Sequence, residues 1–108
     1  MLNLTPHAIK VLSATGEVVE YPASGVLARV DSKSVLIGQI QGHSIYRTEY
    51  GSVHNVPASG TERFIVSAMV LERLGDEYSG WAFAPKSDST AIRLANGQID
   101  HVVGLNTK

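Results

Sequence analysis

The stretch from Val56 to Gly75, VPASGTERFIVSAMVLERLG, decides the fold, because a turn signal, an apolar run and a helix stop follow one another in it without a break. Phe64-Ile65-Val66 is apolar on every side, so we expect it to be buried. Its β-branched residues favour a strand, with Ser67 as the N-cap of the helix that follows. Ala68–Leu74 contains good helix formers. Gly75 is suited to end that helix at the C′ position.

A second interpretation of this stretch keeps the apolar run inside the helix. Thr61 would then cap a helix of about four turns, whereas a start at Ser67 leaves about two turns. In both cases one helix lies within Thr61–Leu74, and the rest of the chain has the alternation and turn signals of strands. The sequence therefore predicts a single domain over residues 1–108 with an α+β fold. We expect a mainly antiparallel, twisted sheet or small open barrel of about six to eight strands, packed against the one helix.

The other expected strands follow from period-two alternation between turn-forming residues. A polar break at Asp31–Ser34 separates two of them, Gly51-Ser52 ends another, and Gly38 marks a bulge. Asn96-Gly97 predicts the tip of a tight hairpin, and Asn106–Lys108 is expected to fray. The expected strands are Ala8–Leu12, Glu17–Tyr21, Val26–Asp31, Val35–Ile40, Ser44–Tyr50, Trp81–Pro85, Thr90–Leu94 and Gln98–Leu105.

Composition excludes several classes of function. The 108 residues carry a formal net charge of −1 with nine scattered basic residues, which argues against a nucleic-acid-binding face. The absence of cysteine excludes disulfides, thiolate zinc sites and cysteine nucleophiles. No apolar run approaches the roughly 20 residues of a membrane span, and the first residues lack the pattern of a signal peptide. We therefore expect neither nucleic acid nor membrane as a partner, and the cytoplasm of the producing cell as the location.

No established catalytic motif is present, and no cofactor is expected. The four histidines lack close ligand spacing, so we expect exposed histidines and no metal site. Ser59 stands in a turn shortly after His54, and a nucleophilic serine needs such a base within reach. The preferred interpretation is a hydroxyl that satisfies local backbone groups. A non-enzymatic protein is the expectation, and a small hydrolase using these two residues is a third alternative.

Arginine and aromatic side chains beside the turns form the most promising set of ligand contacts. Arginine forks bind phosphate or carboxylate, and aromatic faces stack on bases. Arg63 precedes the buried run near a helix start, where backbone N–H groups also favour anions. The alternative is that these side chains lie on sheet faces and cover apolar surface with their stems. The predicted contacts to a small anionic or nucleotide-like ligand are Arg29, Tyr46, Ser59, Thr61 and Arg63.

Two further features concern repetition and self-association. Pro-Ala-Ser-Gly occurs at Pro22–Gly25 and again at Pro57–Gly60, and either an internal repeat or shared turn chemistry explains the recurrence. Strand edges left exposed by a small sheet invite pairing with a second copy. We therefore expect a homo-oligomer, with any ligand site between subunits as an option.

In order along the chain, several short motifs resemble a set of small proteins encoded by phages and prophages. Tyr46–Tyr50 and Trp81 lie outside this resemblance. The resembling segments are Asn3-Leu4-Thr5-Pro6-His7, Pro22–Gly25 with Ala28-Arg29-Val30, Val56-Pro57 with Gly60-Thr61, Ile65–Val70, and Asn96–Ile99 followed by Gly104-Leu105.

The resemblance implies a phage accessory protein made in the cytoplasm of a host bacterium, and it transfers no catalytic residue. By analogy, small phage proteins of this kind are often inhibitors or ligand-sequestering proteins that act against host defence. The leading expectation is therefore a protein that binds and sequesters a small anionic or nucleotide-like ligand, or blocks a host protein. The alternative is a minor virion or assembly protein that acts through oligomerisation at its sheet edges.

Overall fold

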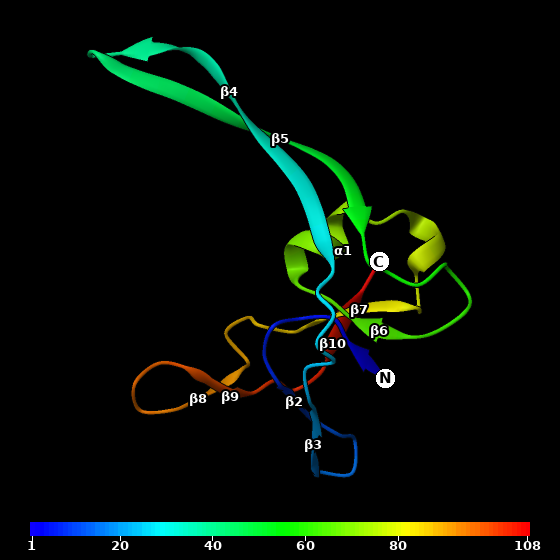
Figure 1. Ribbon diagram of the computed structural model, residues 1–108. Helices are drawn as coiled ribbons and strands as arrows, with labels where there is room; N and C mark the ends of the chain where they lie inside the picture. The colour runs from blue at the N-terminus through cyan, green and yellow to red at the C-terminus, as the bar shows by residue number, and fades with distance from the viewer.

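The computed structural model describes residues 1–108, arranged as one four-stranded sheet and three separate hairpins (Figure 1). The chain is rich in strands and has one short α-helix, which confirms an α+β fold, and the sheets are open and do not close into a barrel. In chain order the elements are β1 (Leu2–Asn3), β2 (Ile9–Leu12), β3 (Val18–Tyr21), β4 (Arg29–Ile40), β5 (His43–His54), β6 (Phe64–Ile65), α1 (Ala68–Arg73), the 3-10 helix η1 (Asp76–Tyr78), β7 (Ala82–Pro85), β8 (Ile92–Arg93), β9 (Ile99–His101) and β10 (Leu105–Thr107).

The four-stranded sheet has the strand order β1-β6-β7-β10. The apolar run predicted to be buried supplies β6, and Phe64, Ile65 and Val66 are all 0% exposed. β6 pairs in parallel with β1 on one side and with β7 on the other, while β10 is antiparallel to β7. The hairpins are antiparallel as predicted, whereas this sheet is largely parallel. Parallel pairing is possible because the connections into and out of β6 are long enough to return the chain to the same end of the sheet.

The helix α1 follows the shorter of the two predicted forms. Ser67 Oγ accepts a hydrogen bond from the Val70 N–H at 3.3 Å, so Ser67 is the N-cap and a start at Thr61 is excluded. Gly75 has a φ of −76° and is the N-cap of η1, so the left-handed C′ conformation predicted for it does not form. The buried cluster to which the helix contributes is Leu4, Phe64, Val66, Val70, Leu71, Leu74, Ala82 and Ala84.

Asn3 ties the first strand to the first hairpin. Its side chain is 1% exposed. Its Nδ2 donates to the carbonyl oxygens of His7 and Tyr21 at 2.8 and 2.9 Å, and its Oδ1 accepts from the N–H and the hydroxyl of Thr5 at 3.0 and 2.7 Å. Every hydrogen-bonding position of the amide is thus used. The Asn-Leu-Thr-Pro-His opening therefore has a structural role in this fold.

Two short hairpins and the last strand complete the body. β2 pairs with β3, and β8 pairs with β9 around the predicted Asn96-Gly97 tip, where Gly97 has a φ of +87°. The predicted second strand of that tip hairpin, Gln98–Leu105, is wrong in its length, because the chain leaves it after β9 and enters the main sheet. The expected fraying of Asn106–Lys108 is also wrong, since Leu105–Thr107 forms the edge strand β10. Thr107 Oγ1 donates to the Ala82 carbonyl at 2.8 Å and holds this strand against β7.

The longest element is the β4–β5 hairpin, residues Arg29–His54, which we call the arm. It projects from the body, which is the four-stranded sheet with α1 and the short hairpins (Figure 1). The strand ends predicted at Asp31–Ser34 and Gly51-Ser52 are wrong, because both segments lie inside the continuous strands β4 and β5, but the ladder shifts register there, between Val30 and Ser32. Beyond its base the hairpin has solvent on both faces, so it accepts polar residues without a break. The ladder shifts register between Leu36 and Gly38, which confirms the irregularity predicted at Gly38.

Candidate functional site

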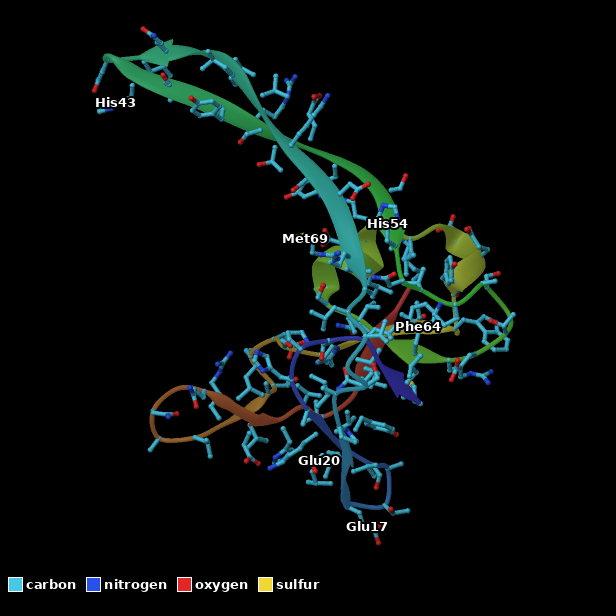
Figure 2. The ribbon with its side chains drawn as sticks, viewed as in Figure 1. Glu17, Glu20, His43, His54, Phe64 and Met69 are labelled. Carbon is cyan, nitrogen blue, oxygen red and sulfur yellow. The ribbon has the colours of Figure 1, made fainter.

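The arm stands largely free of the body. No backbone hydrogen bond outside the β4–β5 ladder involves residues 29–54, so both of its long edges are unpaired. At its base Val30 and Val53 pack against the buried cluster, and the guanidinium carbon of Arg73 on α1 lies 3.9 Å from the ring centroid of Tyr50. Figure 2 shows His43 at the far tip of the arm and Phe64 within the body. The molecule measures 55 × 39 × 24 Å, an elongated shape for 108 residues.

The distal half of the arm, Val35–Tyr46, is rich in large apolar side chains and contains no aspartate, glutamate, lysine or arginine. Its large side chains have no covering layer: Leu36 is 57% exposed, Ile40 is 63% exposed and Tyr46 is 60% exposed. Single exposed apolar residues are common on soluble proteins, whereas here several of them lie together at the end of a projecting element.

The proximal half of the arm, Arg29–Ser34 with Arg47–His54, carries its charges. His54 Nε2 lies 2.7 Å from Asp31 Oδ2, and Lys33 Nζ lies 3.9 Å from Glu49 Oε1. These pairs are exposed and contribute little to stability. Between them the twisted strands form a hollow of about 200 Å³ lined by Asp31, Ser32, Lys33, Glu49, Tyr50 and Gly51.

Three of the predicted ligand contacts lie on one segment that leads into β6. Arg63 stacks on Trp81, with the guanidinium carbon 4.4 Å from the ring centroid, and its Nε donates to the Gly80 carbonyl at 3.2 Å. Thr61 Oγ1 donates to the Ala58 carbonyl at 2.6 Å and closes the turn. Ser59 is exposed within that turn. The contacts of Arg63 and Thr61 are thus local ones within the body.

The remaining two predicted contacts belong to the arm and are not gathered with Arg63. Tyr46 lies in the distal half, opposite Leu36 in the ladder. Arg29 is the first residue of β4, and its guanidinium makes no hydrogen bond or ion pair. Arg29 lines a hollow of about 310 Å³ together with Gly25, Val26, Leu27 and Asn55. The five predicted ligand contacts therefore do not form one site.

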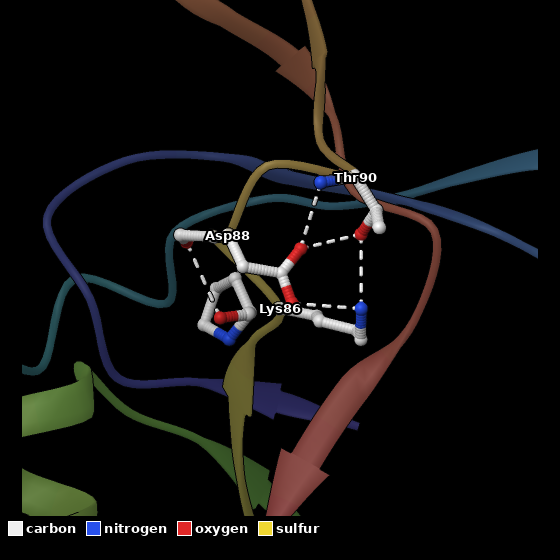
Figure 3. A network of polar contacts seen from close by, with 5 residues as sticks. Lys86, Asp88 and Thr90 are labelled. Atoms are coloured by element: carbon white, nitrogen blue, oxygen red, sulfur yellow. Dashed lines mark hydrogen bonds and ion pairs between the residues drawn. The ribbon is translucent and has the colours of Figure 1, made fainter.

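A polar network occupies the loop after β7 (Figure 3). Lys86 Nζ lies 2.7 Å from Asp88 Oδ2 and donates to Thr90 Oγ1 at 2.9 Å, while the Thr90 N–H donates to Asp88 Oδ1 at 2.9 Å. The hydrogen bond from Lys86, followed by those from Thr90, holds the pKa of Asp88 well below its ordinary value of 3.8. All three side chains are bonded to one another, so the network stabilises the loop and leaves no group activated for chemistry.

The histidines are dispersed, and no three histidine, aspartate or glutamate side chains gather where they could hold a metal ion. His101 Nδ1 lies 2.8 Å from Asp100, and this hydrogen bond is the main cause that lowers the pKa of Asp100, with a smaller contribution from Lys10. No hydrogen bond joins His54 to Ser59, because the imidazole is bonded to Asp31. The geometry that a serine nucleophile needs is not formed.

Comparisons with known proteins add no relative: no protein-family model, no curated protein and no solved structure matches this chain. None of its helices combines the length and the apolar character needed to cross a membrane.

Sequence reasoning missed the arm as a unit, although two signals were present. The run VLIGQIQGHSIY, residues 35–46, is the distal half and lacks formal charge. Gln41 and Gly42 at its middle both have positive φ, 51° and 80°, as a two-residue hairpin turn requires. Gly42 suits such a turn, but glutamine is uncommon at positive φ, so the pair is a weaker hairpin signal than Asn-Gly.

Proposed function

We propose that the chain is a non-enzymatic assembly protein, made in the cytoplasm of a host bacterium and acting as a minor virion or assembly component through its arm. The observation that carries the proposal is a projecting two-stranded ribbon with unpaired edges and an apolar, uncharged distal half. The phage resemblance of the sequence agrees with such a role without identifying it.

Physical chemistry favours an arm that is covered by a partner over an arm that is exposed to solvent. An isolated two-stranded hairpin is marginally stable in water, because neither face nor edge is covered. Exposed strand edges are templates for pairing with another chain, and soluble proteins usually protect them with charge or proline. The distal half has neither protection, so we infer that a partner strand or surface covers it in the assembled state.

Sedimentation velocity across a wide range of protein concentration tests this proposal. The wild-type chain should form a defined oligomer as concentration rises, and a variant carrying Leu36→Ser, Ile40→Ser and Tyr46→Ser should remain monomeric. A matched control replaces Val18 and Val19, which are 47% and 40% exposed on β3, with serine and should associate like the wild type. A wild-type chain that stays monomeric throughout would contradict an assembly role.

The hollow beside Arg29 favours a second candidate function, the binding and sequestering of a small anionic or nucleotide-like ligand. Arg29 is exposed at the base of the arm, and no carboxylate of the chain neutralises it. A free guanidinium beside a concave surface is suited to phosphate or carboxylate recognition. This function and an assembly role are compatible if the ligand site lies near a subunit contact.

Calorimetric titration with inorganic phosphate and with a nucleoside monophosphate tests the second candidate. Binding should be lost in Arg29→Ala and retained in Arg93→Ala, which removes an exposed arginine of β8 outside the hollow. Equal losses in both variants would indicate nonspecific attraction, and no binding by the wild type to either probe would remove support from this candidate.

A further inference from the structure

The outer edge of β5 has a self-complementary sequence. Its middle reads Tyr46-Arg47-Thr48-Glu49-Tyr50, with tyrosines and opposite charges placed symmetrically about Thr48. If two copies align antiparallel with Thr48 opposite the partner's Thr48, Arg47 faces the partner's Glu49. Tyr46 then faces the partner's Tyr50. Opposite charges and aromatic pairs placed directly across a ladder are the stabilising combinations in antiparallel sheets.

The backbone N–H and C=O groups on the outer edge of β5 belong to the alternate residues that this alignment requires. The two-residue turn at Gln41-Gly42 makes the Ile40 and His43 pair a hydrogen-bonded one. Counting along β5, every second residue from Ser44 onward turns its N–H and C=O away from β4, and Thr48 is one of these. Thr48 would thus exchange backbone hydrogen bonds with its own copy.

In the same phase, Arg47 and the partner's Glu49 occupy a non-hydrogen-bonded pair. Side chains approach each other more closely at such pairs than at hydrogen-bonded ones. Arg47 makes no hydrogen bond, ion pair or aromatic contact within its own chain, and the ladder places it opposite the uncharged Val35. The Glu49 carboxylate has only the exposed Lys33 at 3.9 Å. The interface would therefore give the unpaired Arg47 a partner.

The outer edge of β4 is less suited to this pairing. Asp31 is already bonded to His54 at 2.7 Å. Ile37 is the extra residue in the register shift between Leu36 and Gly38, and such an irregularity interrupts a ladder. β5 runs without an added residue from His43 to Tyr50, so it offers the longer regular edge.

We propose that two copies of this chain pair through β5, antiparallel and about a two-fold axis at Thr48, so that the two arms form one four-stranded sheet. This inference rests on the proposed function, in which the arm mediates assembly, and it names the partner as a second copy. About six backbone hydrogen bonds form between the Tyr46–Tyr50 segments of the two copies. Each distal half then lies beside the base of the other arm, near α1, where Met69 is 51% exposed.

Charge reversal tests the register. Arg47→Glu and Glu49→Arg each create two like-charge pairs across the axis and should raise the dimer dissociation constant roughly tenfold. The double variant R47E/E49R restores both ion pairs and should dimerise like the wild type. An equimolar mixture of the two single variants should also dimerise, because the two carboxylates of one chain then face the two guanidinium groups of the other. Lys33→Glu disturbs the pair within the chain and should leave the dimer intact.

Single cysteines give an independent measurement, since the chain has none of its own. Thr48→Cys places two thiols directly across the axis, at a Cα separation of about 5.5 Å that a disulfide can span. It should form a covalent dimer under mild oxidation. Ser44→Cys is the matched control on the same strand, and its two thiols would be about 26 Å apart, so it should stay uncrosslinked.

The outcomes separate this inference from the proposed function. Suppose that the serine variant of the distal half disrupts the oligomer. If the charge variants then have no effect, or if Ser44→Cys crosslinks in preference to Thr48→Cys, the β5 pairing is wrong and the assembly role of the arm stands. A wild-type chain that is monomeric at every concentration overturns both. Loss of dimer in each single charge variant, with recovery in the double variant and in the mixture, establishes the register.

Discussion

The arm and the body are built from strands of one chain, and they differ in what covers those strands. In the body, β6 has a hydrogen-bonded neighbour on each side, and Phe64 is 0% exposed. In the arm, each strand has one neighbour, and Ile40 is 63% exposed. The body is therefore stable through its own contacts, whereas no other part of the chain covers the distal half of the arm. Under the proposed function, stability depends on the body and interaction depends on the arm.

The largest expected difference between the body and the arm comes from truncating one apolar residue in each region. Phe64→Ala should lower the free energy of unfolding by about 3 to 5 kcal/mol, because it opens a cavity in the buried cluster. Leu36→Ala in the arm should change it by no more than about 0.5 kcal/mol when measured at concentrations where the chain is monomeric. Urea denaturation followed by circular dichroism measures both values. A Leu36→Ala effect as large as that of Phe64→Ala would mean that the arm belongs to the folding core.

Asn3 tests whether the body also depends on a buried polar group. Asn3→Ala should cost about 2 to 3 kcal/mol, since the carbonyl oxygens of His7 and Tyr21 and the N–H of Thr5 lose their partner. Asn106→Ala is the control, because Asn106 is exposed and its side chain makes no hydrogen bond, and it should have almost no effect on the urea midpoint. Equal effects of the two substitutions would show that the Asn3 network is dispensable.

The helix cap gives a smaller effect within the body. Ser67→Ala removes the hydroxyl that accepts from the Val70 N–H and should cost about 1 kcal/mol in thermal or urea unfolding. Ser52→Ala, at an exposed serine of the arm that makes no side-chain hydrogen bond, should be neutral. If the two substitutions changed the free energy of unfolding equally, the Ser67 cap would not contribute to the stability of the body.

The smallest expected effect concerns the Asp88 loop and its pH dependence. The pKa of Asp88 is lower in the folded chain than in the unfolded chain. The ionised side chain therefore stabilises the fold fully at pH values above the ordinary pKa of 3.8, and this stabilisation is lost as the pH falls through the lower folded pKa. A carboxyl-carbon NMR titration should therefore show Asp88 still ionised at pH values where an ordinary aspartate is half protonated. Lys86→Met removes the main hydrogen bond and should move the midpoint up toward 3.8. An unchanged midpoint would contradict the role of Lys86.

Local features of the body could be predicted from the sequence. The Phe64-Ile65-Val66 run is buried because no alternation gives it a solvent side, and Ser67 caps the helix because its hydroxyl is the first one available beyond that run. The first hairpin and the Asn96-Gly97 tip follow from turn chemistry. These features depend on neighbours in the sequence, which is why pattern and propensity are sufficient to locate them.

Features that depend on distant partners were not predictable in the same way. The pairing of Leu2 with Phe64 has no local signature, and neither has the placement of Leu105–Thr107 against β7. Polar residues at Asp31–Ser34 look like a break only if the whole strand is assumed to have a buried face, whereas in the arm only the base packs against the body. The predicted ligand contacts were chosen by residue type, and type alone did not reveal that Arg63 stacks on Trp81.

The parallel pairing of β1 with β6 also determines the order in which the chain can fold. Leu2 has no strand to join until Phe64 has been synthesised, and β6 in turn needs Ala82 of β7. The arm hairpin is a local structure that closes on a microsecond timescale, so on the ribosome it precedes the core. During that interval its uncharged distal half is exposed on a chain whose main sheet has not yet formed. If the arms pair as proposed, this order of folding favours pairing between copies translated from the same message.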